Sequence, residues 1–250
     1  MRDWMRDGTR DWLTARPIAH RGLHDGTAGV IENTASAFRA AVAGGYGIEC
    51  DLQISADGEA MVHHDDALGR LTEGDGRLDA LPAAALQRVA FKATVDRMLT
   101  LGELCELVAG RATLLLELKS RFDGDRRLAE RTAAVLEGYG GPVAAMSFDP
   151  GQVASLRGIA PALVRGLVAQ RRDPQAPGHA RASAPRYAHQ MLTARPQFLA
   201  YRLQDLPSAL PLFARHALGL PLLTWTVRTA QDRARAARFA DQIIFEGLRP

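Results

Sequence analysis

Cysteine and lysine are scarce in this sequence. The two cysteines, Cys50 and Cys105, each lie within an apolar pattern. They do not make up a disulfide framework, so nothing favours an oxidising compartment. The two lysines are Lys92 and Lys119, and nearly all positive charge therefore comes from arginine. The net charge of +3 is mild. Its short arginine runs are more typical of solvated helix faces than of a nucleic-acid surface, although a mildly positive field favours an anionic small-molecule substrate.

Long hydrophobic runs are also absent. Residues 1–16 are charged throughout and contain no apolar run typical of a signal peptide. No stretch of the sequence approaches the roughly twenty apolar residues that a membrane span requires. These absences favour a cytoplasmic protein without a stable membrane anchor, and they leave the oligomeric state open.

The N-terminal segment 2–13 carries apolar side chains at helical spacing, namely Trp4, Met5, Trp12 and Leu13. This spacing predicts a short amphipathic helix that closes the bottom of the domain. A role at a membrane surface is less favoured, because the polar face carries as many aspartates as arginines.

The chain of 250 residues is 47% apolar and 24% charged, which is sufficient for one large core. About eight short β-type segments alternate with helical patterns. The predicted strands are 16–21, 47–53, 113–119, 142–148, 162–169, 197–202, 221–227 and 242–246, and 60–64 is a short extended piece after the second of them. The predicted helices are one from Ala35 that ends at Gly44, and 101–108, 125–137, 151–157, 206–216 and 230–239. Such alternation indicates an α/β protein with a parallel sheet, either an open doubly wound sheet or a closed barrel.

Two segments fall outside this alternation. Residues 66–100 lack a clean period and are predicted to form an insertion, and residues 170–185, rich in Pro, Arg and Ala, are predicted to form a loop. Neither resembles a domain linker, so we expect one domain over residues 1–250.

Three carboxylates are placed on predicted strands in a pattern that suits a cation. Neighbouring side chains of a strand point to opposite faces, so Glu49 and Asp51 share one face, as do Glu117 and Lys119 on a later strand. Acids so close repel one another unless a cation lies between them. Oxygen ligands without cysteine suit Mg²⁺ or Ca²⁺ better than Zn²⁺. The alternative is that Glu117 and Lys119 form internal ion pairs with the acids of the earlier strand.

Two histidines lie at predicted strand ends, where parallel α/β proteins build their active sites. His20 and His64 can act as acid and base around one reacting atom, because imidazole titrates near neutral pH. Arg21 offers a planar fork suited to phosphate. His63 alternates away from His64 and is expected to pack against a helix. The other histidines are assigned structural positions in loops or helices: His24, His179, His189 and His216.

The order of these motifs resembles that of the glycerophosphodiester phosphodiesterase family. The motifs are His20-Arg21-Gly22, Glu32-Asn33-Thr34, Glu49-x-Asp51, His64-Asp65 and Glu117-x-Lys119, followed by Ser147-Phe148 and Trp225-Thr226-Val227. A single piece such as His-Arg-Gly is a weak signal, whereas the ordered set is specific. The resemblance extends from His20 to about Val227.

The resemblance implies a TIM (β/α)8 barrel with a small insertion after the second strand, which fits the aperiodic stretch from residue 66. It also implies the hydrolysis of glycerophosphodiesters to glycerol 3-phosphate and an alcohol, with one divalent cation, Mg²⁺ or Ca²⁺, as cofactor. Within the same chemistry, a lysophospholipase D-like activity is an alternative. A non-catalytic phosphate- or glycerol-binding barrel is the alternative from another class.

Carried over to the matching positions, the resemblance implies a role for each residue of the motifs. The implied metal ligands are Glu49, Asp51 and Glu117, and the implied acid–base pair is His20 and His64. Those implied to bind substrate are Arg21 and Lys119 at the phosphate, Glu32 at the metal or the glycerol hydroxyls, and Trp225 at the glycerol end. Asn33 either orients the site or caps the helix that follows it, and Trp225 is alternatively a core aromatic.

Two positions depart from the family pattern. Arg228 stands where the family commonly has Asn, and Glu246 stands near the end of the last strand, where the family usually has Asp before Pro. We expect both to lie at the barrel mouth, to alter the alcohol or headgroup accepted, and to leave the acid–base and metal positions untouched. Arg228 is alternatively a surface residue beyond the strand end.

Overall fold

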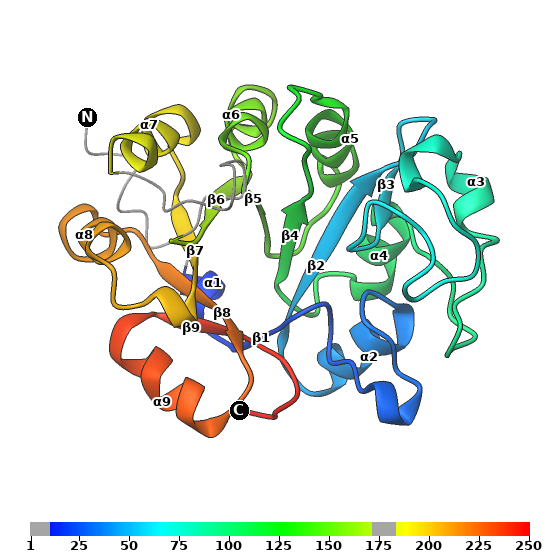
Figure 1. The fold of residues 1–250 in the computed structure, drawn as a ribbon, viewed down its shortest axis with the longest axis horizontal. Helices are drawn as coiled ribbons and strands as arrows, with labels where there is room; N and C mark the ends of the chain where they lie inside the picture. Colours follow the sequence, from blue (N-terminus) through cyan, green and yellow to red (C-terminus); the bar gives the residue numbers. More distant parts are fainter. Residues whose placement is uncertain (1–10, 172–183) are drawn as a thin grey trace.

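Eight parallel strands close into a barrel in the computed structural model, which describes residues 11–171 and 184–250 (Figure 1). In barrel order they are β1 (Ile18–Ala19), β2 (Gly47–Ile54), β4 (Leu114–Leu118), β5 (Val143–Ser147), β6 (Val164–Ala169), β7 (Phe198–Arg202), β8 (Leu222–Val227) and β9 (Gln242–Phe245). β1 pairs in parallel with both β2 and β9, so the sheet has no open edge at this point. The predicted TIM barrel is confirmed, and the open doubly wound sheet is wrong.

Helices surround the barrel on its outside (Figure 1). They are α2 (Ala35–Ala43), α4 (Leu101–Val108), α5 (Arg127–Leu136), α6 (Pro150–Ile159), α7 (Ala184–Ala194), α8 (Ala209–Leu218) and α9 (Ala230–Phe239). The predicted helices 101–108 and 230–239 match α4 and α9, whereas the sequence pattern predicts no helix at α7 and assigns its first two residues to the loop 170–185. None of the helices in the described residues has the length and apolarity needed to cross a bilayer.

The alternating faces of the strands produce two apolar layers. The outward side chains of β2, such as Ile48 and Leu52, join Phe38 of α2 in the layer between barrel and helices. The inward side chains of the other strands, such as Leu115 and Phe198, fill the barrel interior. Burial of both layers removes apolar surface from water and fixes the register of each strand.

The bottom of the barrel is closed by α1 (Asp11–Thr14). Leu13 is fully buried in the same cluster as the inward residues of the barrel, and Trp12 packs against that cluster. This agrees with the predicted closing role of the N-terminal segment, although Trp4 and Met5 lie outside the described residues.

The segment after β2 has a small core of its own. β3 (Ala60–Val62) pairs antiparallel with β2, and α3 (Ala83–Leu86) follows within residues 66–100. The core of this insertion consists of Met61, Leu78, Leu86, Phe91 and Met98. His63 is buried, and the centroid of its ring lies 6.4 Å from that of Phe91. Phe91 does not belong to a helix, although the sequence pattern predicts that His63 packs against one.

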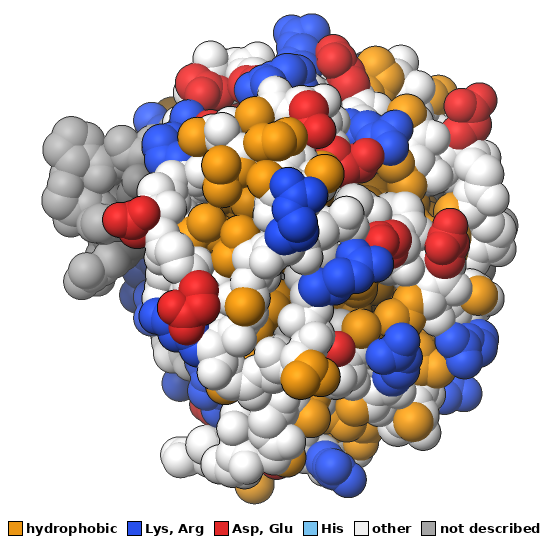
Figure 2. All heavy atoms as spheres, turned by 90° about the vertical axis from the view of Figure 1, so that its right-hand side faces the viewer, with side chains coloured by type: hydrophobic (Ala, Val, Ile, Leu, Met, Phe, Trp, Pro, Cys, Tyr) orange, Lys and Arg blue, Asp and Glu red, His pale blue; other side chains and the backbone are white. Residues whose placement is uncertain are grey.

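Charges of both signs are interspersed on the face that carries the insertion (Figure 2). Apolar side chains lie between them, and no continuous area of one sign covers this face. The face therefore lacks the basic stripe that is typical of a nucleic-acid surface.

Gly166 provides a test of the packing inside the barrel. It lies on β6, and a Cβ added there would lie 2.2 Å from Cζ of Phe198. We expect Gly166→Ala to lower the free energy of unfolding by about 1–3 kcal/mol, because overpacking forces the ring or the backbone to move. Urea unfolding measures the change.

Gly158→Ala is the matched control, since a Cβ at Gly158 on α6 would meet nothing within 4 Å. It should be neutral or stabilise by up to about 1 kcal/mol, because alanine favours helix. Equal stability of the two variants would contradict the described contact between β6 and β7.

Candidate active site

A cavity of about 470 Å³ lies at the carboxyl ends of the strands. Eight of the predicted site residues line it: His20, Arg21, Glu49, Asp51, His64, Glu117, Lys119 and Trp225. They come from β2, β4 and β8 and from the segments that follow β1, β3 and β4. Glu32 is not among the described residues that line the cavity, but it contacts Arg21, which does.

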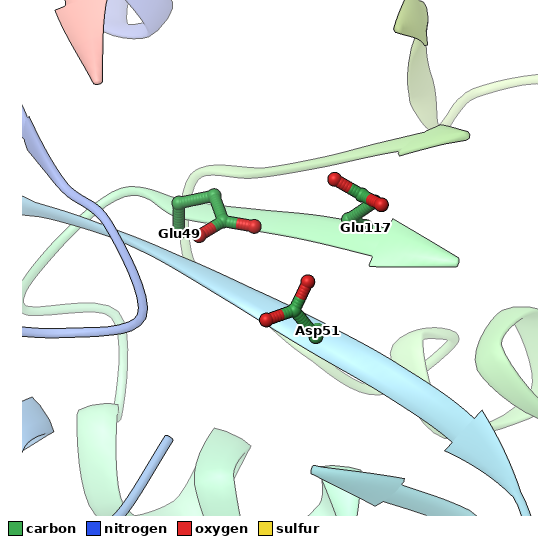
Figure 3. A group of neighbouring side chains, drawn as sticks. All are labelled: Glu49, Asp51 and Glu117. Carbon is green, nitrogen blue, oxygen red and sulfur yellow. The ribbon is translucent and has the colours of Figure 1, made fainter. Parts of the chain in front are cut away.

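The three predicted metal ligands are brought together by strand register. Glu49 and Asp51 lie on the inner face of β2, and Glu117 of β4 lies opposite Asp51 (Figure 3). One oxygen from each carboxylate lies within 4.8 Å of the others, and all three residues are buried. Oε1 of Glu49 is buried without a hydrogen-bond partner in the described residues. An unpartnered acceptor among converging carboxylates fits a hard divalent cation.

Basic side chains neutralise part of this acidic cluster. Nζ of Lys119 lies 2.8 Å from Oδ1 of Asp51 and 2.5 Å from Oε1 of Glu117, and Nε of Arg21 lies 3.2 Å from Oδ2 of Asp51. The internal ion pairs that the sequence left as an alternative are therefore present. Within the described residues, neither lysine nor arginine pairs with Glu49.

The two carboxylates of β2 consequently differ in proton affinity. Burial and the nearby Asp51 raise the pKa of Glu49 to about 8. Burial also acts to raise the pKa of Asp51, but Lys119 and Arg21 outweigh it and hold that pKa well below its usual range. Burial opposes the charge on Lys119, but Asp51 and Glu117 raise its pKa above the usual value. Of the three predicted metal ligands, Glu49 is thus the one whose charge the protein compensates least.

Asn33 orients one of these acids. Its Nδ2 donates to Oδ2 of Asp51 at 2.9 Å, and its backbone has a left-handed φ of 57°. Thr34 occupies the N-cap position of α2. Of the two readings of Asn33, orientation of the site agrees with the structure, and the capping role is wrong.

His20 is held by Glu246, the residue that follows β9, the last strand of the barrel. Its Nδ1 donates to Oε2 of Glu246 at 2.9 Å, and its Nε2 lies 3.9 Å from Oε2 of Glu49. Burial lowers the pKa of His20, but the bond to Glu246 and the charge of Glu49 outweigh it, so the pKa is raised. In turn, the bond from His20 is the main cause that lowers the pKa of Glu246 to about 2.

The expectation that Glu246 leaves the acid–base positions untouched is therefore wrong. β9 lies next to β1 in the closed barrel, and the backbone nitrogen of His20 donates to the carbonyl of Phe245. The side chain that follows β9 must then lie beside the one that follows β1. Arg228 also binds Glu246, with Nη2 3.0 Å from Oε2, and its side chain is 53% exposed at the cavity rim.

His64 is connected to Glu32 through two residues. Its Nδ1 donates to Oδ1 of Asp65 at 2.8 Å, and the other oxygen of Asp65 accepts from Nε of Arg70 at 2.5 Å. Oε1 of Glu32 accepts from Nη2 of Arg70 and from Nη1 of Arg21. Neither Arg70 nor the position of Glu32 between two arginines is predicted by the sequence pattern. The proposed contact of Glu32 with metal or glycerol stays a prediction.

Two aromatic side chains, Trp225 and Phe148, form part of the cavity wall. The rings of Trp225 and Phe148 meet edge to face at a centroid distance of 5.7 Å, and both residues line the cavity. Nε1 of Trp225 is buried without a partner in the described part of the chain. An apolar wall with one free donor suits a small polyol, whose carbons pack against rings while a hydroxyl accepts a hydrogen bond.

Comparison with known proteins relates most of the chain to one family. Residues 20–247 match the Glycerophosphoryl diester phosphodiesterase family. The chain is 30% identical over 163 residues to a glycerophosphodiester phosphodiesterase of Caldanaerobacter subterraneus subsp. tengcongensis, with 61% of this chain and 66% of that protein aligned. It is 34% identical over 125 residues to glycerophosphodiester phosphodiesterase 1 of Rattus norvegicus, with 46% of this chain and 36% of the rat protein aligned. The alignments thus span about two thirds and about one third of these relatives.

Solved structures share the fold. A phosphodiesterase from Oleispira antarctica, solved with its product sn-glycerol-3-phosphate, superposes with a TM-score of 0.77 at 22% identity and covers 94% of both chains. A glycerophosphodiester phosphodiesterase from Thermotoga maritima superposes with a TM-score of 0.71 at 22% identity and covers 91% of this chain and 92% of its own. At this identity the likeness supports the barrel alone.

The raised pKa of Glu49 makes stability depend on pH in a defined direction. Its folded-state pKa of about 8 lies above the value of an unfolded glutamate, so the folded protein binds the extra proton and loses stability as pH rises between the two values. In chelator, we expect Glu49→Gln to change the free energy of unfolding little at pH 5 and to raise it by about 2–4 kcal/mol at pH 8.5.

Urea unfolding at the two pH values tests this expectation. Glu106→Gln, at an exposed position on α4, is the matched control and should show no such dependence on pH. Added Mg²⁺ or Ca²⁺ should stabilise the wild type at pH 8.5 and not Glu49→Gln. An effect of Glu49→Gln that is equal at both pH values would contradict the assigned environment.

Proposed function

This chain belongs to the glycerophosphoryl diester phosphodiesterase family, and from that membership we propose that it hydrolyses glycerophosphodiesters to glycerol 3-phosphate and an alcohol. The observation that carries the proposal is the meeting of three buried carboxylates and two histidines in one cavity. These are the groups that metal-assisted phosphodiester cleavage requires.

The carboxylates Glu49, Asp51 and Glu117 would hold one divalent cation, Mg²⁺ or Ca²⁺. When bound, the cation would supply Lewis-acid stabilisation of charge on the phosphoryl oxygens. Arg21 and Lys119 would add hydrogen bonds to the same oxygens from the cavity wall. Both are already anchored on Asp51, so their positions need little reorganisation when substrate arrives.

The two histidines would move the protons. The bond from Nδ1 of His20 to Glu246 leaves Nε2 facing the carboxylates, where it would take a proton from the nucleophile. By family analogy, that nucleophile is the glycerol 2-hydroxyl, which would displace the alcohol and form a cyclic phosphate that water then opens. His64, held through Nδ1 by Asp65, would protonate the oxygen of the departing alcohol with Nε2. The negative charge of Glu246 would stabilise the imidazolium of His20.

Removal of either imidazole tests the acid–base roles. His20→Ala and His64→Ala should each lower kcat by about 10²–10⁴-fold, the usual contribution of a general acid or base. Release of glycerol 3-phosphate from glycerophosphocholine, with and without chelator, measures the loss. His216→Ala, at an exposed position on α8, is the control and should keep wild-type turnover.

Two outcomes would contradict the proposal. Wild-type turnover in both histidine variants would rule out their catalytic roles. Failure of wild-type protein to cleave any phosphodiester with Mg²⁺, Ca²⁺ or Mn²⁺ would favour the non-catalytic barrel.

Glu246 is expected to act through His20, because it is not among the described residues that line the cavity. Glu246→Gln keeps an acceptor for Nδ1 of His20 but loses the charge that stabilises the imidazolium. We expect kcat to fall by roughly 10–100-fold with little change in KM, a smaller loss than that of deleting a catalytic group. Steady-state kinetics separates the two constants. Partial recovery in Glu246→Asp would support the role of the charge, whereas a change in KM alone would contradict it.

A further inference from the structure

A second cavity, of about 700 Å³, opens beside the first. It lies between the insertion, which contributes Asp66 and Arg70, and the segment after β4, which contributes Arg121 and Asp123. Two of the predicted site residues, His64 and Lys119, line both cavities. The two spaces therefore meet at the group that would protonate a leaving alcohol and at a cation that would bind phosphate.

This junction assigns the two ester arms of a phosphodiester to different cavities. A phosphoryl group held between His64 and Lys119 extends one arm into each space. The first cavity has the aromatic wall of Trp225 and Phe148, which suits glycerol. The second cavity is left for the alcohol that departs on the side of His64.

The charges of the second cavity are not balanced. Its arginines already have acidic partners. Arg70 pairs with Asp65 and Glu32, Arg121 with Asp79, and Arg127 with Asp125. Asp66 and Asp123 also line the cavity, both at exposed positions. No cation forms a salt bridge with either in residues 11–171 and 184–250, although the charge of Asp123 acts on Arg127 from a longer distance. The unsatisfied charge of this space is therefore negative, and it favours an alcohol that carries a positive group.

A buried amide adds an acceptor in the same wall. Gln152 is 4% exposed and lines the cavity. Its Nε2 donates to the carbonyl of Asp125, and its Oε1 is buried without a partner in the described residues. An acceptor left unpaired at this depth costs free energy unless a ligand or water donates to it. The cavity thus offers carboxylates and an amide oxygen, all of which accept hydrogen bonds.

The cavity is not built for a quaternary ammonium group. Such groups have no N–H to donate, and proteins bind them in cages of aromatic rings. No Phe, Tyr or Trp is among the described residues that line this cavity. A primary ammonium group, in contrast, donates three hydrogen bonds and matches the acceptors that are present.

We propose that the second cavity binds the alcohol arm of the substrate and selects alcohols with a primary ammonium group. The inference rests on the proposed function, since it names the class of diester that this site cleaves. Selection comes from Asp66 and Asp123 at the rim and from Gln152 deeper in the wall.

Three diesters that share the glycerophosphoryl part test the proposal. Glycerophosphoethanolamine carries a primary ammonium, glycerophosphocholine a quaternary one, and glycerophosphoglycerol no charge on its alcohol. We expect kcat/KM to be roughly 10-fold higher for glycerophosphoethanolamine than for the other two, the effect of one or two charge-assisted hydrogen bonds. The double variant Asp66→Asn/Asp123→Asn should reduce that preference about 10-fold, mainly through KM for glycerophosphoethanolamine.

Asp75→Asn is the matched control, because Asp75 is an exposed acid in the same insertion and is not among the described residues that line the cavity. It should keep the wild-type preference. Equal kcat/KM for the three diesters, or a double variant that keeps the preference, would overturn this inference and leave the proposed function intact. Absence of turnover with all three diesters would instead overturn the proposed function itself.

Discussion

The repulsion between Glu49 and Asp51 is the constraint on which the site depends. Both lie on the inner face of β2, and the register with β4 adds Glu117 to the same point. Burial of several like charges costs free energy unless opposite charges or protons compensate them. Lys119, Arg21 and Asn33 all contact Asp51, whereas Glu49 takes up a proton more readily. The basic side chains therefore compensate the charge of Asp51 more fully than that of Glu49. A divalent cation beside Glu49 would supply the charge that they do not.

Closure of the barrel brings the two departures from the family pattern together beside His20. β9 lies next to β1, so the residue after β9 meets His20. The side chain of Glu246 is one methylene longer than that of the aspartate usual in the family. Its Oε2 is bound by both His20 and Arg228. Arg228 and Glu246 therefore form one structural unit at the rim. Loss of Glu246 would remove the partner of both His20 and Arg228, whereas loss of Arg228 would leave Glu246 bound to His20.

Local alternation made much of the fold and site predictable. It placed Glu49, Asp51 and Glu117 on inner faces, because a side chain's face in a strand depends only on its neighbours. The sequence left two roles open for Asn33, and the choice between them could not be predicted, since it depends on a left-handed backbone in a loop. The contact between Glu246 and His20 follows from a closed barrel, because closure places the last strand beside the first. α7 had a signal that was overlooked: Tyr187 and Ala194 are buried at helical spacing, directly after the segment rich in proline and arginine.

The insertion after β2 is part of the site's polar framework. Asp51, Arg21, Glu32, Arg70, Asp65 and His64 form a continuous chain of ion pairs and hydrogen bonds, in that order. Three of these six residues, His64, Asp65 and Arg70, follow β3, and the insertion has its own apolar core that fixes the backbone on which they stand. Exposed ion pairs contribute little to stability by themselves. Their value here is geometric, because one carboxylate, Glu32, fixes the guanidinium of Arg21 directly and the imidazole of His64 through Arg70 and Asp65. Positions that loops alone would leave variable are thereby tied to the rigid strand β2.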